Sequence, residues 1–145
     1  MNSEPATTTY LVSEPFDRAL KAIREALSGN DLSVTTELDI TSRLKRELRI
    51  GSTPCRILLV DSPYLLLEAT TFDCAAGVLF PLHLVVSGRG PQTQVHVINR
   101  AAIEGLRLPA GAAGPLAKLQ FLVSRSLERV AMRKDIYPAV LAQAR

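Results

Sequence analysis

The 145-residue sequence contains no tryptophan, and its only aromatic residues besides histidine are three tyrosines and four phenylalanines. Because bulky aromatic side chains are so few, the core has to consist mainly of Leu, Val, Ile and Ala. A chain of this length is expected to form one domain and to bury about 68–70% of its extended-chain surface. It therefore needs neither a metal nor a disulfide in order to fold.

The two cysteines, Cys55 and Cys74, match neither a disulfide framework nor a metal-ligand spacing. Cys55 begins an apolar stretch, and Cys74 follows Asp73. Burial in the first case and a neighbouring anion in the second disfavour the thiolate form. We expect no thiol chemistry at either residue.

Long hydrophobic runs are also missing. The longest one, from Ala75 to Val86, contains Pro81 and His83 and is shorter than the ~20 residues that a membrane-spanning helix needs. The beginning, MNSEPATTTY, lacks the basic and apolar regions of a secretory signal. We expect no membrane association and a cytoplasmic location.

Catalytic and nucleotide-binding motifs are absent as well. There is no nucleophile elbow, HExxH or CxxC, and SGRGPQ at 87–92 lacks the lysine and hydroxyl residue of a phosphate-binding loop. No motif brings together a nucleophile, a base and an orienting group. The sequence favours a non-catalytic module that binds an unknown small ligand or protein partner through a pocket or a dimer surface; an enzyme is the alternative.

Apolar periodicity predicts three amphipathic helices. The first begins at Pro15 and ends before Gly29, where a left-handed C-cap is favoured. The second covers 42–49 and is ended by Gly51, and the last begins at Pro115. In the first, four apolar residues recur at steps of four, three and four. The apolar stripes are Phe16, Leu20, Ile23 and Leu27; Ile40, Leu44 and Leu48; and Leu116, Leu119, Val123, Leu127 and Val130.

Strand patterns separate these helices. Alternating or continuous apolar runs predict strands at 8–12, 32–39, 55–60, 77–86 and 93–98, and Ser62-Pro63 begins a further short helix at 63–70. Residues 101–114 are predicted to be a connector. The order β-α-β-α-β-α-β-β-α is typical of a two-layer α+β domain with helices packed on one face of a sheet.

This domain is expected to span 8–137, between a disordered N-terminus at 1–7 and a frayed C-terminus at 138–145. The run at 55–60 is apolar enough for a strand that is buried on both faces. We predict a core that combines the helices with this strand and the next one. Its members are Leu20, Ile23, Leu27, Ile57, Leu59, Val85, Leu119 and Val123.

Basic and acidic residues gather around the second helix. The basic ones could bind phosphate, which makes weak nucleic-acid binding an alternative function, although no aromatic residue nearby could stack on bases. The net charge of +3 permits an anionic partner without requiring one. Glu37 and Asp39 flank Leu38 and are expected on one strand face, where they would bind a cation, do acid–base chemistry or simply face water. The basic residues are Arg43, Lys45, Arg46, Arg49 and Arg56.

Three segments resemble domain of unknown function family 302, an uncharacterised bacterial and archaeal family. They are TELDI with RLKREL (36–48), ILLVDSP (57–63) and VLFPLHLVV (78–86). The resemblance implies a mostly antiparallel sheet and a homodimer, and it implies no established activity.

The resemblance also marks candidate site positions. The family's strand glutamate falls on Glu37. Its Cys-Asn-Pro triplet falls on Asp61, Ser62 and Pro63, and its Pro-Cys-Asn triplet falls on Pro81, Leu82 and His83. Both family cysteines are replaced, so thiol chemistry at these positions is impossible here.

His83 and His96 are the only histidines, and both lie in the predicted hairpin. If Ser87 pairs with Gln92, His83 lies directly opposite His96. With Asp61 at the end of a neighbouring strand, the three side chains would suit zinc or a similar divalent ion. The alternatives are an ordinary pair of strand histidines, or a bulge at Pro81 that separates them.

Overall fold

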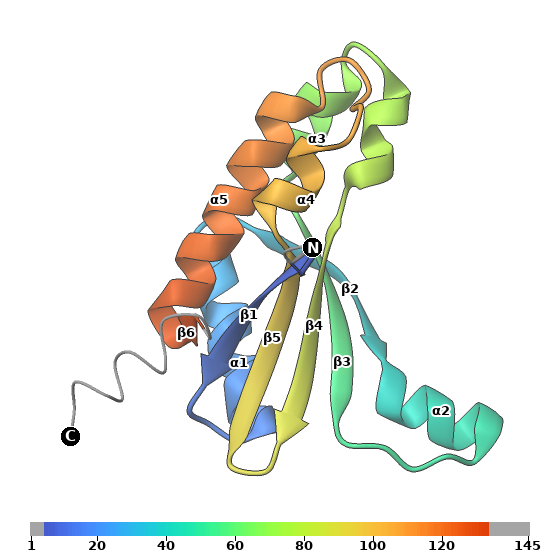
Figure 1. Ribbon diagram of the computed structural model, residues 1–145, viewed down its shortest axis with the longest axis vertical. Coiled ribbons are helices and arrows are strands. Elements are labelled where there is room, and N and C mark those ends of the chain that lie inside the picture. The colour runs from blue at the N-terminus through green and yellow to red at the C-terminus, as the bar shows by residue number, and fades with distance from the viewer. Residues whose placement is uncertain (1–4, 134–145) are drawn as a thin grey trace.

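The computed structural model describes residues 5–133, and it consists of one antiparallel sheet with helices against one face (Figure 1). The six strands have the order β2-β3-β4-β5-β1-β6, and every neighbouring pair is antiparallel. The predicted α+β class is confirmed. The strands are β1 (Thr7–Val12), β2 (Ser33–Asp39), β3 (Cys55–Asp61), β4 (Leu82–Arg89), β5 (Gln92–Ile98) and β6 (Met132–Arg133).

Two long helices, α1 (Phe16–Ser28) and α5 (Ala113–Val130), cover the sheet and pack against each other. Their predicted apolar stripes face the core, with Ile23, Leu27 and Leu119 fully inaccessible and only the end members Phe16 and Val130 half-buried. A polar link joins the helices, because the Asn30 side-chain amide donates a hydrogen bond to Ser126 Oγ at 2.7 Å. No described helix has the length and apolar character needed to cross a membrane.

The helix ends differ in detail from the prediction. Pro15 is the N-cap of α1 rather than its first residue. Gly29 keeps a right-handed conformation, and Asp31 instead adopts the left-handed one, with φ of 58°. Aspartate tolerates this conformation better than most residues. The last helix ends at Val130, and predictions for residues 134–145 lie outside the described part of the chain.

The predicted core is wrong for β3 and β4. The side chains that are fully buried against the helices are Leu58 and Val60 on β3 and Leu84 and Val86 on β4. Because successive strand residues point to opposite faces, the intervening side chains point away from the helices. Ile57, Leu59 and Val85 therefore lie half-buried on the other face, which we call the open face.

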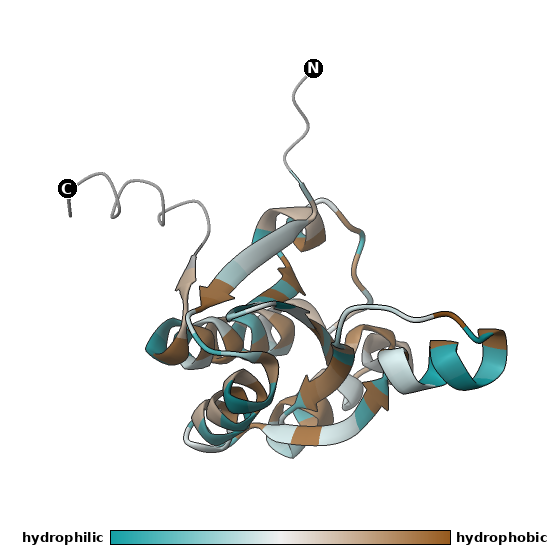
Figure 2. Cartoon of the chain, turned by 90° about the horizontal axis from the view of Figure 1, so that it is seen from below, coloured by the Kyte–Doolittle hydropathy of each residue, from teal (hydrophilic) through white to brown (hydrophobic). Residues whose placement is uncertain are grey.

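Helix α2 (Ile40–Leu48) projects from the end of β2 beyond the sheet (Figures 1 and 2). Its N-cap is Asp39, whose carboxylate accepts a hydrogen bond from the Ser42 backbone N–H at 3.0 Å. Arg49, with φ of 54°, ends it, whereas Gly51 was expected to do so. None of its residues is buried, so packing within the described chain does not explain its apolar stripe.

The strand predicted at 77–86 begins only at Leu82. Before it lie α3 (Pro63–Thr70) and η1 (Cys74–Leu79), a short 3-10 helix whose N-cap Asp73 accepts from the Ala75 N–H at 2.9 Å. The Phe80–Pro81 peptide bond is cis. Pro81 precedes β4, so this residue neither forms a β-bulge nor interrupts the hydrogen-bond ladder of the strand. The predicted connector contains one more helix, α4 (Arg100–Glu104).

The hairpin register is also corrected. Arg89 pairs with Gln92, and Val85 is opposite His96. The turn contains only Gly90 and Pro91, with Gly90 at a positive φ of 63°. Glycine at the first of two turn residues is the requirement of a tight type II′ turn. The four-residue turn assumed in the sequence analysis shifted the register by two.

The two faces of β3 predict different costs of truncation. Leu58→Ala should lower the free energy of unfolding by about 2–5 kcal/mol, because it leaves a cavity in the core. Leu59→Ala, on the open face, should cost less than about 1.5 kcal/mol. Urea unfolding of both variants measures this difference. Equal losses would contradict the assignment of the faces.

Candidate functional site

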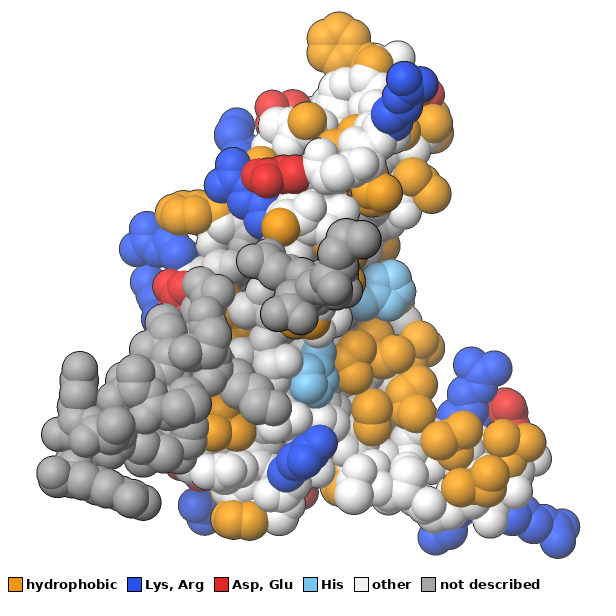
Figure 3. All heavy atoms as spheres, viewed as in Figure 1, with side chains coloured by type: hydrophobic (Ala, Val, Ile, Leu, Met, Phe, Trp, Pro, Cys, Tyr) orange, Lys and Arg blue, Asp and Glu red, His pale blue; other side chains and the backbone are white. Residues whose placement is uncertain are grey.

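A pocket of about 370 Å³ lies on the open face, where β4 and β5 meet η1 and α4. We call it the open-face pocket. Its walls are mainly apolar, and two imidazoles add polar groups. Figure 3 shows both histidines on this face, with hydrophobic side chains beside them. Its lining includes Val78, Leu79, Pro81, Val85, Ile98, Ile103 and Leu106, together with His83 and His96.

The strand register places the two histidines on the same face but not directly opposite each other. Val85 opposes His96, and His83 is two residues away from Val85 along β4. Such diagonal neighbours are typically about 7–8 Å apart, whereas opposed residues are about 4.5–5.5 Å apart. The predicted shared face is confirmed, and the predicted direct pairing is wrong.

His96 is held in place by the neighbouring strand. Thr9 lies directly across from it on β1, and the Thr9 hydroxyl is 2.9 Å from His96 Nδ1. His83 is exposed and pairs with Leu59 through the backbone. The pocket therefore has one fixed imidazole and one accessible imidazole.

The expected metal ligands do not form a cluster. Asp61 is only 6% exposed and does not line the open-face pocket, and burial raises the pKa of its carboxyl group. Within residues 5–133, no group of three or more His, Cys, Asp or Glu side chains could hold a metal ion. Zinc binding by His83, His96 and Asp61 stays a prediction without geometric support.

The family-site positions fall in three separate places. Pro81, Leu82 and His83 line the open-face pocket. At the start of α3, Ser62 accepts a hydrogen bond from the Leu65 N–H at 3.5 Å, and Pro63 is the first helical residue. The sequence could not place these positions relative to one another, because their distance depends on the strand order.

Glu37 lies on the helix-facing side of β2 in an ion-pair network. Its carboxylate accepts hydrogen bonds from Arg24 Nε at 2.6 Å and from Arg24 Nη2 at 2.7 Å. Arg56 lies 3.4 Å from Glu37 and 3.3 Å from Asp39. The hydrogen bonds from Arg24 are the largest cause that lowers the pKa of Glu37. With its oxygens occupied by two guanidinium groups, Glu37 joins β2 to α1 and β3.

The basic residues of α2 are exposed, and Arg43 pairs with Glu47 at 3.4 Å. Nucleic-acid binding by this helix stays a prediction.

Neither cysteine lines the open-face pocket. Burial, and to a lesser extent the negative charge of Asp39, raises the pKa of the Cys55 thiol. Ile103 and Leu106 in the pocket wall could not be identified from the sequence, because they lie in a segment predicted to be an irregular connector.

The ion pair of Glu37 predicts a pH-dependent stability. The pKa of Glu37 is lowered in the folded state, so its contribution is present above the unfolded value of about 4.3 and is lost as the pH falls. Glu37→Gln should cost about 1 kcal/mol at neutral pH, after allowance for the solvent exposure of Arg24.

Denaturant unfolding at several pH values measures this effect. The difference between the parent protein and Glu37→Gln should shrink steadily below about pH 4. Glu47→Gln, in an exposed ion pair on α2, is the matched control and should change little. A constant difference down to pH 3 would contradict the ion-pair assignment.

Comparisons with known proteins agree with this architecture. The family model "Domain of unknown function DUF302" matches residues 8–124. A crystal structure of an uncharacterized conserved protein DUF302 from Bacillus stearothermophilus has a similar fold, with a TM-score of 0.77 and 20% sequence identity. The similarity covers 88% of this chain and 99% of that protein. No curated protein matches the sequence.

Proposed function

The chain belongs to the DUF302 family, and we propose that it is a non-catalytic binding module that holds a small, largely apolar ligand in the open-face pocket. One observation carries the proposal. The family-site positions Pro81, Leu82 and His83 line the same cavity as His96, on the sheet face that α1 and α5 leave uncovered. Its volume of about 370 Å³ lies within the usual range of ligand sites.

The lining indicates the ligand chemistry. Val85, Ile98 and Ile103 offer apolar surface to the body of a ligand. His83 is exposed and can donate a hydrogen bond to an acceptor at the end of the ligand. An apolar chain with a terminal carboxylate combines both properties.

Octanoate is a suitable probe, and octanol is its uncharged counterpart. In a titration followed by ¹⁵N NMR, octanoate should shift the amide signals of β4, β5 and η1. His83→Ala should weaken octanoate binding at least about tenfold, the loss expected for one hydrogen bond to a charged group, and should change octanol binding less.

Arg89→Ala is the matched control, because Arg89 is exposed on β4 and does not line the pocket. It should leave octanoate affinity unchanged. Absence of pocket shifts, or equal losses in the two variants, would refute the proposed site. The cytoplasmic location expected from the sequence stays a prediction.

The same face supports a homodimer. Helix α2 has no residue buried by the described part of its own chain, and Leu48 and Ile50 are 61% and 52% exposed. The open face is not covered by α1 or α5, and Figure 3 shows apolar side chains on it and toward α2. A two-fold arrangement, with α2 of each copy on the open face of the other, would cover both apolar surfaces, and the open-face pocket, at one end of that face, would lie at the edge of the interface. The apolar side of the last helix, α5, is buried in its own chain and is not available for such a contact.

Light scattering tests the dimer at protein concentrations of tens of micromolar, because an interface of standard size should persist in this range. The parent protein should be dimeric, and the double variant Leu48→Asp with Ile50→Asp should be monomeric. Leu67→Asp, at an α3 residue that is 66% exposed, is the control and should remain dimeric. A monomeric parent protein would refute this arrangement.

A further inference from the structure

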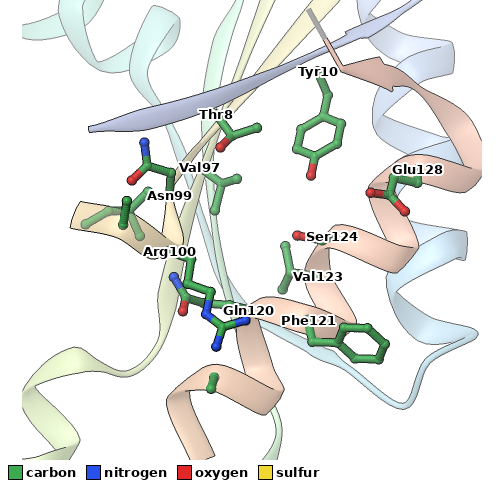
Figure 4. Close-up of a pocket in the computed structure, with 13 residues that line it drawn as sticks. Thr8, Tyr10, Val97, Asn99, Arg100, Gln120, Phe121, Val123, Ser124 and Glu128 are labelled. Atoms are coloured by element: carbon green, nitrogen blue, oxygen red, sulfur yellow. The ribbon is translucent and has the colours of Figure 1, made fainter. Parts of the chain in front are cut away.

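A second cavity of about 390 Å³ opens between β1 and α5 (Figure 4). We call it the β1–α5 cleft. Thr8 and Tyr10 face it from β1, across from Val97 and Val95 on β5. The intervening residue Thr9 pairs with His96 and points to the open face. The cleft and the open-face pocket therefore lie on opposite sides of the sheet.

One hydroxyl points into the cleft, and one amide nitrogen beside it is buried without a partner among the described residues. The ring of Tyr10 is buried, and its hydroxyl points into the cleft, where it makes no hydrogen bond within residues 5–133 and is open to a ligand (Figure 4). The Nε2 atom of Gln120 is fully buried and has no hydrogen-bond acceptor. A buried donor without an acceptor destabilises the fold, and native proteins rarely leave one.

Charged groups of opposite sign lie on opposite sides of the cleft. Arg100 from α4 is on one side and Glu128 from α5 on the other (Figure 4). Arg100 Nε donates to Glu104 at 2.8 Å, a bond that leaves its two terminal nitrogens available. Glu128 forms no ion pair with another residue of the described chain.

We propose that the β1–α5 cleft binds a small zwitterion of dipeptide size. Its carboxylate lies at Arg100 and accepts a hydrogen bond from Gln120, and its ammonium group lies at Glu128. The Tyr10 and Ser124 hydroxyls bond the polar atoms between the two charges, and Val97 and Val123 contact the apolar side chain. Opposite charges at the two ends exclude a ligand that carries only one sign, because one side would then repel it.

The exposed ring of Phe121 completes the rim of the cleft. It is 60% exposed and lies 5.8 Å from the Arg125 guanidinium, measured to the ring centroid. This contact holds the ring at the edge, where it provides an apolar surface for a second side chain. The volume of about 390 Å³ is large enough for two residues of a peptide.

The dipeptide Leu-Ala is the probe, and N-acetyl-Leu-Ala-amide is the matched control that lacks both charges. In ¹⁵N NMR titrations of the full chain, Leu-Ala should shift the amide signals of Tyr10, Gln120 and Ser124. The capped peptide should bind at least about tenfold more weakly, since it cannot pair with Arg100 or Glu128. This comparison requires no variant, so a folding defect cannot obscure it.

Variants then assign the individual contacts. Gln120→Leu, which keeps the approximate volume, should weaken Leu-Ala binding about tenfold, and Arg100→Gln and Glu128→Gln about fivefold each. Arg107→Gln is the control, because Arg107 is exposed and does not line the cleft. Equal affinity for the free and capped peptides, or no shift at millimolar Leu-Ala, would overturn the proposal. Shifts at His83 and Val85 alone would assign the peptide to the open-face pocket and would likewise overturn it.

Discussion

The two-residue periodicity of β-strands is the constraint on which this structure depends. β3 and β4 carry apolar side chains at successive positions, so both of their faces are apolar. The helices α1 and α5 cover only one of these faces, on which Leu58, Val60, Leu84 and Val86 are fully buried. The other face keeps half-buried apolar side chains, and the open-face pocket lies at one end of it.

The projecting α2 helix follows from the same arrangement. Asp39 ends β2 and caps α2, so the chain leaves the sheet at its edge strand. The hydrogen bond from the Cys55 N–H to Thr41 Oγ1, at 2.8 Å, fixes the start of α2 to β3. The ion pairs of Glu37 with Arg24 and Arg56 attach this edge of the sheet to α1. The edge of the sheet is thus firmly held, and the helix that follows it has no residue buried among residues 5–133.

The sequence predicted the helices and most strands, because periodicity and capping residues are local properties. Phe16 to Leu27 shows this best, since its apolar spacing alone defines the buried side of α1. Which face of β3 is buried against the helices could not be predicted, because an apolar run has no periodicity that distinguishes Leu58 from Leu59. The error at His83 and His96 had another cause: the register depends on a two-residue turn at Gly90, whose composition also suits a longer one.

The β1–α5 cleft could not be predicted either, because Tyr10 and Gln120 are 110 positions apart in the sequence and have no motif in common. Such sites depend on tertiary packing. The family resemblance, by contrast, correctly predicted the sheet and identified three residues of the open-face pocket, Pro81, Leu82 and His83.

The central claim is that one face of β3 and β4 forms the core and the other is left for binding. Methyl NMR with a soluble gadolinium chelate tests it most directly. In dilute protein, the chelate should strongly relax the methyl groups of Ile57, Leu59 and Val85, and concentration to the dimeric state should protect them. The methyl groups of Leu58, Val60, Leu84 and Val86 should be shielded under both conditions. Equal shielding of the two sets in dilute protein would contradict the account.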